Sequence, residues 1–440
     1  MAGRRQSHRQ LKKAAPSHND QSPARKDMQT NERSLSHDST VEGETRKEEG
    51  AEDMLDRRIL GSLLERNNTV EASVIHADER LSELGVKRIG PQSSNQELRR
   101  INRMCSNISE DYLSDYGDQE RHWNDFWLYE PKNEEEAILG LERAHQLGIR
   151  TTIRGSGHSM NGSSLPTNGG LLILTTSLNK VVIYPSGEVD VGAGVQVLIV
   201  DEFIRRFGLC LPVVNDGGAP APTIGGFICA GGFGVSSNEY GGFWNHVSSV
   251  RCWIPGKGTV TMCRGEDSFW NLFGCGKPEG VILSATLTTL GNYTGNRISS
   301  HLDFQYVEHP RRIWFTFLAP EKKTSVLRRA IIRLDKELEP YWQGLPPYEY
   351  IINGNGAPIP PGFFPNHHGS LAAIGVWGLM TEKGNENIHA IIKKIRKFTE
   401  QETYVRRYWQ SELGIESPHS WQNSDTTVDG NQRGYIQAQT

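Results

Sequence analysis

The sequence predicts an α+β fold that follows a long charged tail. All Phe, Trp and Tyr residues lie at or after Tyr112, so the first quarter of the chain lacks the side chains that contribute most to core burial. After that point, helices with one apolar face are interspersed with short apolar strands, and the final part reads as strand, helix, two strands and helix. The 440 residues are enough for two or three domains.

The first part of the chain, residues 1–105, is predicted to be a disordered charged tail. It is rich in Arg, Lys, Glu, Asp, Ser, Asn and Gln, and this composition buries too little apolar surface to offset the chain entropy. The basic start, from Met1 to Lys13, would by itself suit nucleic acid or a membrane surface. Acidic residues soon alternate with the basic ones, however, and a tail of mixed charge is usually only solvated. We therefore expect no nucleic-acid partner and no membrane partner.

One segment of this tail has helical periodicity. Its apolar residues recur at roughly helical spacing, which predicts a short amphipathic helix. They are Met54, Leu55, Ile59, Leu63 and Leu64. Such a helix docks on the body of the protein or on a partner, and the sequence leaves both open.

Charge, hydropathy and cysteine usage indicate a cytoplasmic protein. The net charge of −4 is too small to imply a polyanionic partner. No stretch approaches the length of a membrane span, and no apolar segment of the secretory type follows the basic start. The six cysteines have no C-x-x-C spacing, so we expect mostly buried free thiols, a reducing compartment and no metal site. They are Cys105, Cys210, Cys229, Cys252, Cys263 and Cys275.

The first folded domain is predicted over residues 106–294. A helix begins at the N-cap Asn133, with Glu136 as its reciprocal partner, and ends near Gly148. The other expected elements are strands at 149–153, 171–174, 181–184 and 188–191, a helix at 197–207, a hairpin of strands 247–254 and 259–262, and a strand at 283–290.

The first of these strands leads into a glycine-rich loop, Arg154-Gly155-Ser156-Gly157-His158-Ser159. Two glycines around a serine let successive backbone N–H groups turn toward one point, which forms an anion nest suited to a pyrophosphate. The loop is not the nicotinamide-dinucleotide fingerprint, because Met160 stands where the third glycine of G-x-G-x-x-G would fall.

This loop resembles the R-G-x-G-H-S loop of the vanillyl-alcohol oxidase and p-cresol methylhydroxylase (PCMH) family of FAD enzymes, and within it the branch of cytokinin dehydrogenases and alditol oxidases. The likeness continues through residues 169–173, Thr223-Ile224-Gly225-Gly226 and residues 271–290, so it covers roughly residues 123–290. It implies a PCMH-type FAD-binding domain of two small α+β subdomains, followed by a substrate-binding cap domain.

The resemblance also names the residues expected to bind FAD. The first loop would form the pyrophosphate cradle, and the segment from Thr223 would form part of the other wall. In the resembled branch the loop histidine is bonded to the 8α carbon of the flavin, and this role transfers to His158. Arg154 would either neutralise phosphate or brace the loop. The expected set is Arg154, Gly155, Ser156, Gly157, His158, Ser159, Asn161, Thr223, Gly225, Gly226, Gly280, Val281 and Ile282.

Glycines and prolines over residues 215–226 predict an irregular path, which runs along the cofactor in the resembled family. Gly231, Gly232 and Gly234 continue this path. The run Gly274-Cys275-Gly276-Lys277 is not a phosphate loop, because Pro278 stands where a Ser or Thr should bind magnesium. Residues 277–279 also depart from the family pattern, which has more glycine and an aromatic residue there.

Oxidation of an alcohol or amine needs a base for the proton lost from O–H or N–H. In cytokinin dehydrogenases an aspartate shortly before the T-x-G-G segment has this role, which makes Asp216 a candidate. Asp216 is equally explained as a turn-forming residue. In alditol oxidases the base and substrate clamps come from the cap domain, and candidates of that kind are Glu349 and Tyr350, with His367 and His368 in the loop that follows.

The cap domain is predicted over residues 295–440. Strands at 314–318, 348–352 and 371–377, with helices before Pro340 and over 388–398, predict an antiparallel sheet with helices on one face. The polar residues 411–440 are expected to fray.

Together, the resemblance implies an FAD-dependent oxidase or dehydrogenase. It would take a hydride from a CH–OH or CH–NH carbon of a small molecule onto a His-linked flavin and pass the electrons to oxygen or another acceptor. Two alternatives stay open: a non-covalent FAD oxidoreductase of the same fold, and a catalytically silent flavin-fold binding module. The second is motivated by the short C-terminal part, since only about 150 residues follow Gly291. The substrate and the oligomeric state do not follow from the sequence.

Overall fold

The computed structural model describes residues 77–89, 112–114, 120–122, 125–159, 161–215, 221–274, 280–291, 312–354, 358–364, 367–408 and 436–437. Contacts group residues 69–440 into one compact unit. We call residues 125–291 the body and residues 312–408 the cap.

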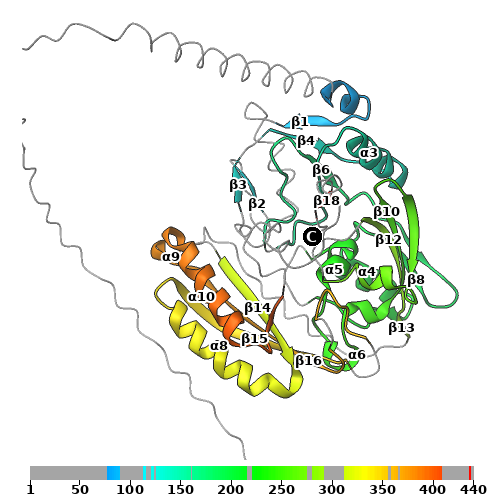
Figure 1. The fold of residues 1–440 in the computed structure, drawn as a ribbon. Coiled ribbons are helices and arrows are strands. Elements are labelled where there is room, and N and C mark those ends of the chain that lie inside the picture. Colours follow the sequence, from blue (N-terminus) through cyan, green and yellow to red (C-terminus); the bar gives the residue numbers. More distant parts are fainter. Residues whose placement is uncertain are drawn as a thin grey trace, which may run out of the picture. The chain divides into compact units, whose positions relative to one another are not determined.

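The body begins with a five-stranded sheet in the order β1-β4-β6-β5-β18 (Figure 1). Its strands β4, β6 and β5 are parallel and fully buried, and they divide the core into two clusters on opposite faces of the sheet. The bounds are β1 Lys87–Ile89, β4 Phe126–Tyr129, β5 Thr151–Arg154, β6 Leu171–Leu174 and β18 Ile436–Gln437. Between β4 and β5 runs α3 (Glu134–Gln146), where Asn133 Oδ1 accepts from Glu136 N at 2.9 Å and Glu136 Oε2 accepts from Lys132 N at 2.8 Å. The predicted helix is confirmed.

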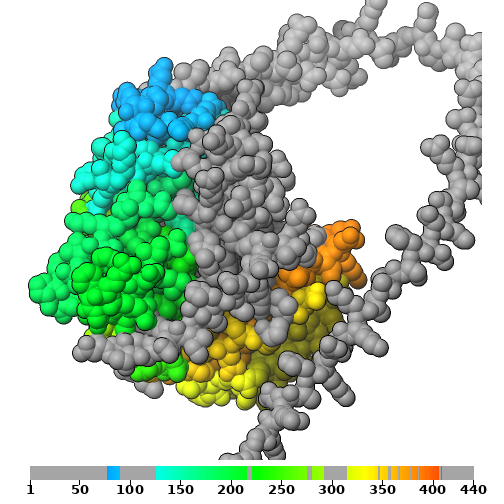
Figure 2. Space-filling view, turned by 180° about the vertical axis from the view of Figure 1, so that it is seen from behind, coloured from blue at the N-terminus to red at the C-terminus, as the bar shows by residue number. Residues whose placement is uncertain are grey.

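Residues 77–89 correct the predicted extent of the tail. Residues 77–82 are helical, and β1 pairs antiparallel with β4, so this segment completes the edge of the sheet beside the cyan start of the body (Figure 2). Leu81 is fully buried and Ile89 is 2% exposed. Aliphatic residues can dock on an existing sheet without aromatic partners, which the aromatic distribution could not reveal. The predicted amphipathic helix at 54–64 lies outside the described residues.

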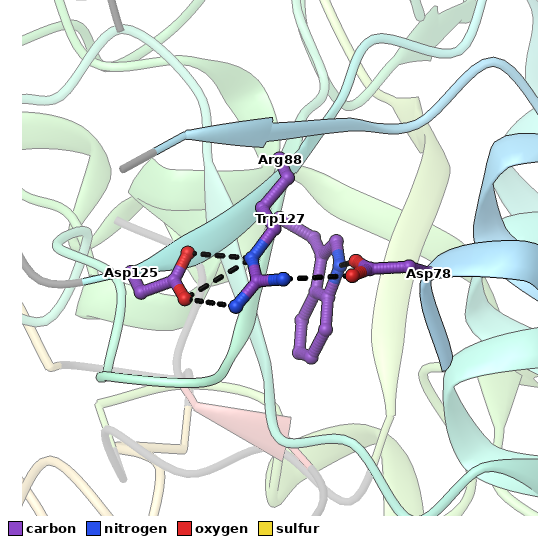
Figure 3. A network of polar contacts seen from close by, with 4 residues as sticks. All are labelled: Asp78, Arg88, Asp125 and Trp127. Carbon is purple, nitrogen blue, oxygen red and sulfur yellow. Dashed lines mark hydrogen bonds and ion pairs between the residues drawn. The ribbon is translucent and has the colours of Figure 1, made fainter. Parts of the chain in front are cut away.

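An ion-pair network holds this added edge (Figure 3). Arg88 Nε donates to Asp125 Oδ1 at 2.8 Å, and Arg88 Nη1 donates to Asp78 Oδ2 at 2.7 Å. Asp78 Oδ1 also accepts from Trp127 Nε1 at 2.6 Å. The network therefore connects the helical turn, β1 and β4.

The second half of the body is an antiparallel sheet in the order β11-β10-β12-β8-β7. Its strands are β7 Val181–Ile183, β8 Val189–Gly192, β10 Val247–Ile254, β11 Gly258–Cys263 and β12 Val281–Leu287. Helices α4 (Val197–Arg205) and α5 (Ile224–Ala230) contribute buried residues to the same core cluster. The expected irregular path therefore ends at Thr223, because Ile224, Gly225 and Gly226 already belong to α5. The remaining elements of this half are β9 Leu209–Cys210, α6 Ser237–Tyr240, η1 Phe243–His246, α7 Asp267–Trp270 and β13 Leu290–Gly291; a hairpin of β2 Tyr112–Ser114 and β3 Glu120–His122 precedes the body.

The cap is an antiparallel sheet in the order β15-β16-β14-β17, with α8 and α10 covering one face (Figure 1). Its elements are β14 Arg312–Pro320, η2 Glu321–Lys323, α8 Thr324–Leu338, β15 Trp342–Ile352, β16 Leu371–Met380, α9 Glu382–Glu386, α10 Ile388–Gln401 and β17 Arg406–Arg407. The helix-covered face carries Phe315, Phe317, Ile374 and Val376. The opposite face joins the core of the body through Leu318, Ile352, Leu371 and Ala373. The predicted arrangement, an α+β fold with this cap, is confirmed.

Three further observations complete the fold. Residues 436–437, expected to fray, form β18 parallel to β5, with Ile436 opposite Thr151. No helix within the described residues is long and apolar enough to cross a membrane. Among the cysteines that the structure describes, Cys210, Cys229 and Cys252 are buried and free, and Cys263 is free and exposed.

Candidate functional site

The glycine-rich loop at residues 154–159, which we call the cradle loop, follows directly from β5. The loop contacts the segment that leads into α5, where Ser156 Oγ donates to the carbonyl of Ala221 at 2.7 Å. Gly155 lies so close to Thr223 that a Cβ at Gly155 would come within 2.4 Å of Thr223 Oγ1. The structure thus brings together the two segments that the sequence assigned to opposite walls of the cofactor site.

Three backbone donors in the middle of the cradle loop have no partner in the described part of the chain. Gly155, Ser156 and Gly157 are buried, yet their backbone N–H groups find no acceptor among the described residues. Buried backbone N–H groups are nearly always paired, because leaving one unpaired costs about as much as a lost hydrogen bond. Gly157 has φ +75°, the left-handed conformation that turns successive N–H groups toward one side. An anion such as a diphosphate would satisfy these donors, so the residues fit the expected group.

Arg154 braces the loop from within. Its side chain is fully buried, and Nη1 donates to the carbonyl of Ser164 at 3.3 Å. Ser164 Oγ also lies 2.6 Å from Ser159 Oγ. Asn161 Oδ1 accepts from Ser163 N at 3.1 Å, which stabilises the turn after the loop. Arg154 thus contacts the following turn through a serine carbonyl, and its role toward phosphate stays a prediction.

The other expected wall of the cofactor site, at the start of α5, packs closely on the cradle loop. Thr223 is the N-cap, and its Oγ1 accepts from Gly226 N at 3.3 Å. Ile224 N and Gly225 N donate to the carbonyls of Val195 and Ala193. The N–H groups of Ile224, Gly225 and Gly226 are therefore already paired, in contrast to those of Gly155, Ser156 and Gly157.

His158 differs from its neighbours in exposure. Its residue is partly exposed, whereas Ser156 and Ser159 are 2% exposed and fully buried. His158 is therefore less enclosed than these two serines of the loop.

Gly280, Val281 and Ile282 lie where β12 begins. Val281 pairs with Trp253 and Ile282 with Cys252 on β10, and both are buried. A Cβ at Gly280 would come within 2.5 Å of the Trp253 carbonyl, so glycine is needed for this close approach. The role of this segment in cofactor binding stays a prediction.

The two catalytic candidates have different outcomes. Asp216 lies outside the described residues. Glu349 forms a two-pronged ion pair with Arg328 of α8, with Arg328 Nη2 at 2.8 Å from Oε2 and 2.9 Å from Oε1. Glu349 pairs with Ile374 in the sheet, so it lies on the helix-covered face. This placement favours a structural role, and the catalytic assignment stays a prediction.

The opposite face of the cap sheet carries Tyr348, which the sequence analysis did not name, and Tyr350, which it named as a candidate. Tyr348 hydrogen-bonds through its hydroxyl to Thr316 Oγ1, and its ring lies over Gly375, where any Cβ would overlap it. Tyr350, on the same face, contacts Phe233 of the body with ring centroids 6.0 Å apart. Side chains alternate between the two faces along a strand, so Tyr348 and Tyr350 lie on one face and Glu349 lies on the other. The spacing of these residues in the sequence already indicated this separation.

Of the two histidines in the following loop, His367 contacts residues of its own loop. His367 Nε2 lies 3.3 Å from the carbonyl of Ser370, and its ring contacts Phe364. Among the residues that the structure describes, no group of three or more His, Cys, Asp or Glu is placed to hold a metal ion.

One buried histidine has a shifted pKa. His246 Nε2 lies 2.9 Å from the Tyr240 carbonyl, and burial lowers the pKa of its imidazole to about 4, with the nearby Arg264 contributing in the same direction. This contact joins the end of η1 to the last residue of α6.

Comparisons with known proteins agree with this geometry. Residues 127–264 match the family of FAD binding domains. The chain is 31% identical to D-lactate dehydrogenase of Archaeoglobus fulgidus over 37% of this chain and 38% of that protein. It is 34% identical to decaprenylphosphoryl-beta-D-ribose oxidase of Mycolicibacterium smegmatis over 45% of this chain and 48% of that protein. The match to the FAD binding family confirms the expected FAD-binding domain.

Among solved structures, a glucooligosaccharide oxidase from Acremonium strictum is similar at a TM-score of 0.40 and 14% identity, over 82% of this chain and 66% of that one. The chain matches less than half the length of the two sequence relatives named above.

Proposed function

We propose, from the membership of residues 127–264 in the FAD binding domain family, that the whole protein is an FAD-dependent oxidoreductase. The observation that carries the proposal is a set of three buried backbone N–H groups, at Gly155, Ser156 and Gly157, that have no acceptor within the described part of the chain. They offer a diphosphate three donors in a pre-formed loop.

The proposed reaction is oxidation of a CH–OH or CH–NH carbon of a small molecule, with oxygen or another molecule as final acceptor. When bound, FAD supplies the hydride acceptor. The names of the two relatives support a hydroxyl-bearing substrate, since one is a lactate dehydrogenase and the other an oxidase of a ribose derivative. The chain's own residues hold the cofactor, orient the substrate and accept its proton.

We propose Asp216 as the proton acceptor, with Glu349 as the weaker candidate because Arg328 already engages it. Tyr348, hydrogen-bonded to Thr316 on the face that joins the core of the body, is proposed to orient the substrate. A hydroxyl held in one direction by a threonine presents its other lone pair or its proton in a fixed direction.

We also propose that His158 carries the flavin covalently. Its partly exposed position on an otherwise buried loop and its place in the R-G-S-G-H-S sequence support this assignment. Precipitation of the purified protein with acid tests it: yellow colour should remain in the pellet, and His158→Ala should release it to the supernatant. A colourless wild-type pellet under a yellow supernatant would leave a non-covalent FAD enzyme.

FAD binding itself is tested by absorbance and reconstitution. The purified protein should show flavin bands in the visible range, or acquire them with added FAD. Protein that carries no flavin and takes up none contradicts the proposed function. Photoreduction followed by exposure to air then separates an enzyme from a silent binding module, because a flavin that never cycles with any donor would indicate the module.

The buried free thiols Cys210, Cys229 and Cys252 support a reducing, cytoplasmic location for this enzyme. Fractionation of cells that express the full chain tests this proposal.

A further inference from the structure

The loop between β15 and β16 inserts a side chain into the body. Residues 358–364 form a turn in which Phe363 N and Phe364 N both donate to the Pro360 carbonyl, at 2.9 and 3.0 Å. Phe363 is 2% exposed although it lies in a connecting loop. Loops usually run over the surface, so this burial points to a specific docking contact.

Two glycines of the body form the socket for this ring. A Cβ at Gly231 would come within 2.8 Å of Phe363 Cδ2, and a Cβ at Gly274 within 2.9 Å of Phe363 Cβ. Both glycines have positive φ, +66° and +67°. Gly274 N donates to the Cys229 carbonyl at 3.0 Å, which ties one wall of the socket to α5. The socket therefore belongs to the same helix whose start packs on the cradle loop.

Aromatic rings from both parts surround Phe363. Its ring centroid lies 4.7 Å from that of Trp244 and 6.0 Å from that of Phe233, both in the body. On the cap side, Tyr408 lies 5.7 Å away, and Tyr408 N donates to the Thr316 carbonyl. Phe233 also contacts Tyr350. Contacts of this kind give each ring a preferred geometry. A movement of Phe363 would therefore shift the rings that contact β14 and β15.

We propose that Phe363 is a positioning residue: seated between Gly231 and Gly274, it fixes the cap sheet against the body and so sets where Tyr348 and Tyr350 stand relative to the bound cofactor. The proposal rests on the proposed function for its second half only. The first half, that one ring fixes the cap on the body, holds with or without FAD.

A distance measurement between the two parts tests the first half. One spin label is placed on the exposed Cys263 of β11, and the second on Lys336→Cys on the exposed side of α8, in the full chain with Cys105 and Cys275 changed to serine. The doubly labelled protein that keeps Phe363, which we call the parent, should give one narrow distribution of distances between the two labels. Phe363→Ala should broaden it in both the FAD-free and the FAD-loaded protein, and Phe363→Leu, which keeps most of the apolar volume, should lie between them.

Phe398→Ala is the matched control. Phe398 is also a buried phenylalanine of the cap, but its ring packs on Phe317 inside the helix-covered core, 4.9 Å between centroids. This variant should lower the stability of the cap and leave the distribution narrow. A Phe363→Ala or Phe363→Leu distribution as narrow as the parent, or equal broadening in Phe398→Ala, would overturn the proposal.

Quenching of FAD fluorescence by iodide tests the second half. In the loaded protein, Phe363→Ala should raise the quenching constant several-fold while FAD content stays at the parent level, and Phe398→Ala should leave it unchanged. Unchanged quenching despite a broadened distribution would reject the effect on the cofactor site. Absence of bound FAD in the parent would instead count against the proposed function, and the spin-label result would still decide the docking role of Phe363.

Discussion

Thr223 packs so closely against Gly155 that no side chain fits at position 155. A Cβ there would come within 2.4 Å of Thr223 Oγ1 and 2.7 Å of its Cγ2. This contact joins the end of β5 to the start of α5, and it is the point at which the two halves of the FAD-binding domain meet around the cradle loop.

The first prediction concerns this contact. Gly155→Ala should displace the cradle loop and abolish retention of FAD, and the strain should lower the free energy of unfolding by about 1–3 kcal/mol. FAD absorbance per protein and thermal melting measure the two effects. Gly265→Ala is the control, because a Cβ at Gly265 meets nothing within 4 Å. Normal FAD content in Gly155→Ala would show that the loop does not form the cradle.

The second prediction concerns residues 77–89. Leu81 is fully buried, so Leu81→Ala should cost about 2–5 kcal/mol of unfolding free energy, as large-to-small changes in cores do. Glu79→Ala, at an exposed position of the same helical turn, should change it little. Chemical denaturation of both variants measures the difference. Equal stabilities would mean that this segment does not contribute to the core.

The third prediction concerns pH. The pKa of His246 is lowered from 6.5 to about 4 in the folded protein, so the unfolded state binds its proton more readily. Its contribution to stability is therefore complete above pH 6.5 and is lost as the pH falls from 6.5 toward 4, by up to roughly 3 kcal/mol. His246→Gln, which can still donate to the Tyr240 carbonyl, should flatten this part of the pH dependence of the melting temperature. The same slope in both proteins would assign the effect to other groups.

The fourth prediction separates the cap residues. Glu349→Gln should lower stability by only about 0–1 kcal/mol, because its ion pair with Arg328 is exposed, and it should leave the rate of flavin reduction by an active substrate near wild type. Tyr348→Phe should slow that rate with little change in FAD content, because the phenol points to the face opposite the helices. Stopped-flow reduction under anaerobic conditions measures both. A hundredfold loss in Glu349→Gln would restore that residue as the base.

Local sequence signals predicted the elements whose cause is local. The N-cap Asn133 with Glu136 located the start of α3, and apolar periodicity located α8 and α10. The cradle loop was recognisable because its glycines, serine and histidine occur in one short run.

What the sequence did not reveal depends on tertiary contacts. Leu81 and Ile89 look like isolated aliphatic residues in a charged segment, and only the edge of β4 gives them a surface to cover. The pairing of Ile436 with Thr151 is equally non-local. Glu349 was expected at the active site, but which face of a strand receives the helices depends on how α8 packs, and α8 provides Arg328 on that face.

The unpaired donors of the cradle loop have a consequence for how the protein matures. When the protein folds without FAD, the buried N–H groups of Gly155, Ser156 and Gly157 lose their hydrogen bonds to water. No acceptor in the described chain compensates for this loss. Binding of FAD therefore stabilises the folded protein by mass action. The amount of intact protein in a cell should follow the supply of riboflavin, because proteases degrade the protein that has not bound FAD.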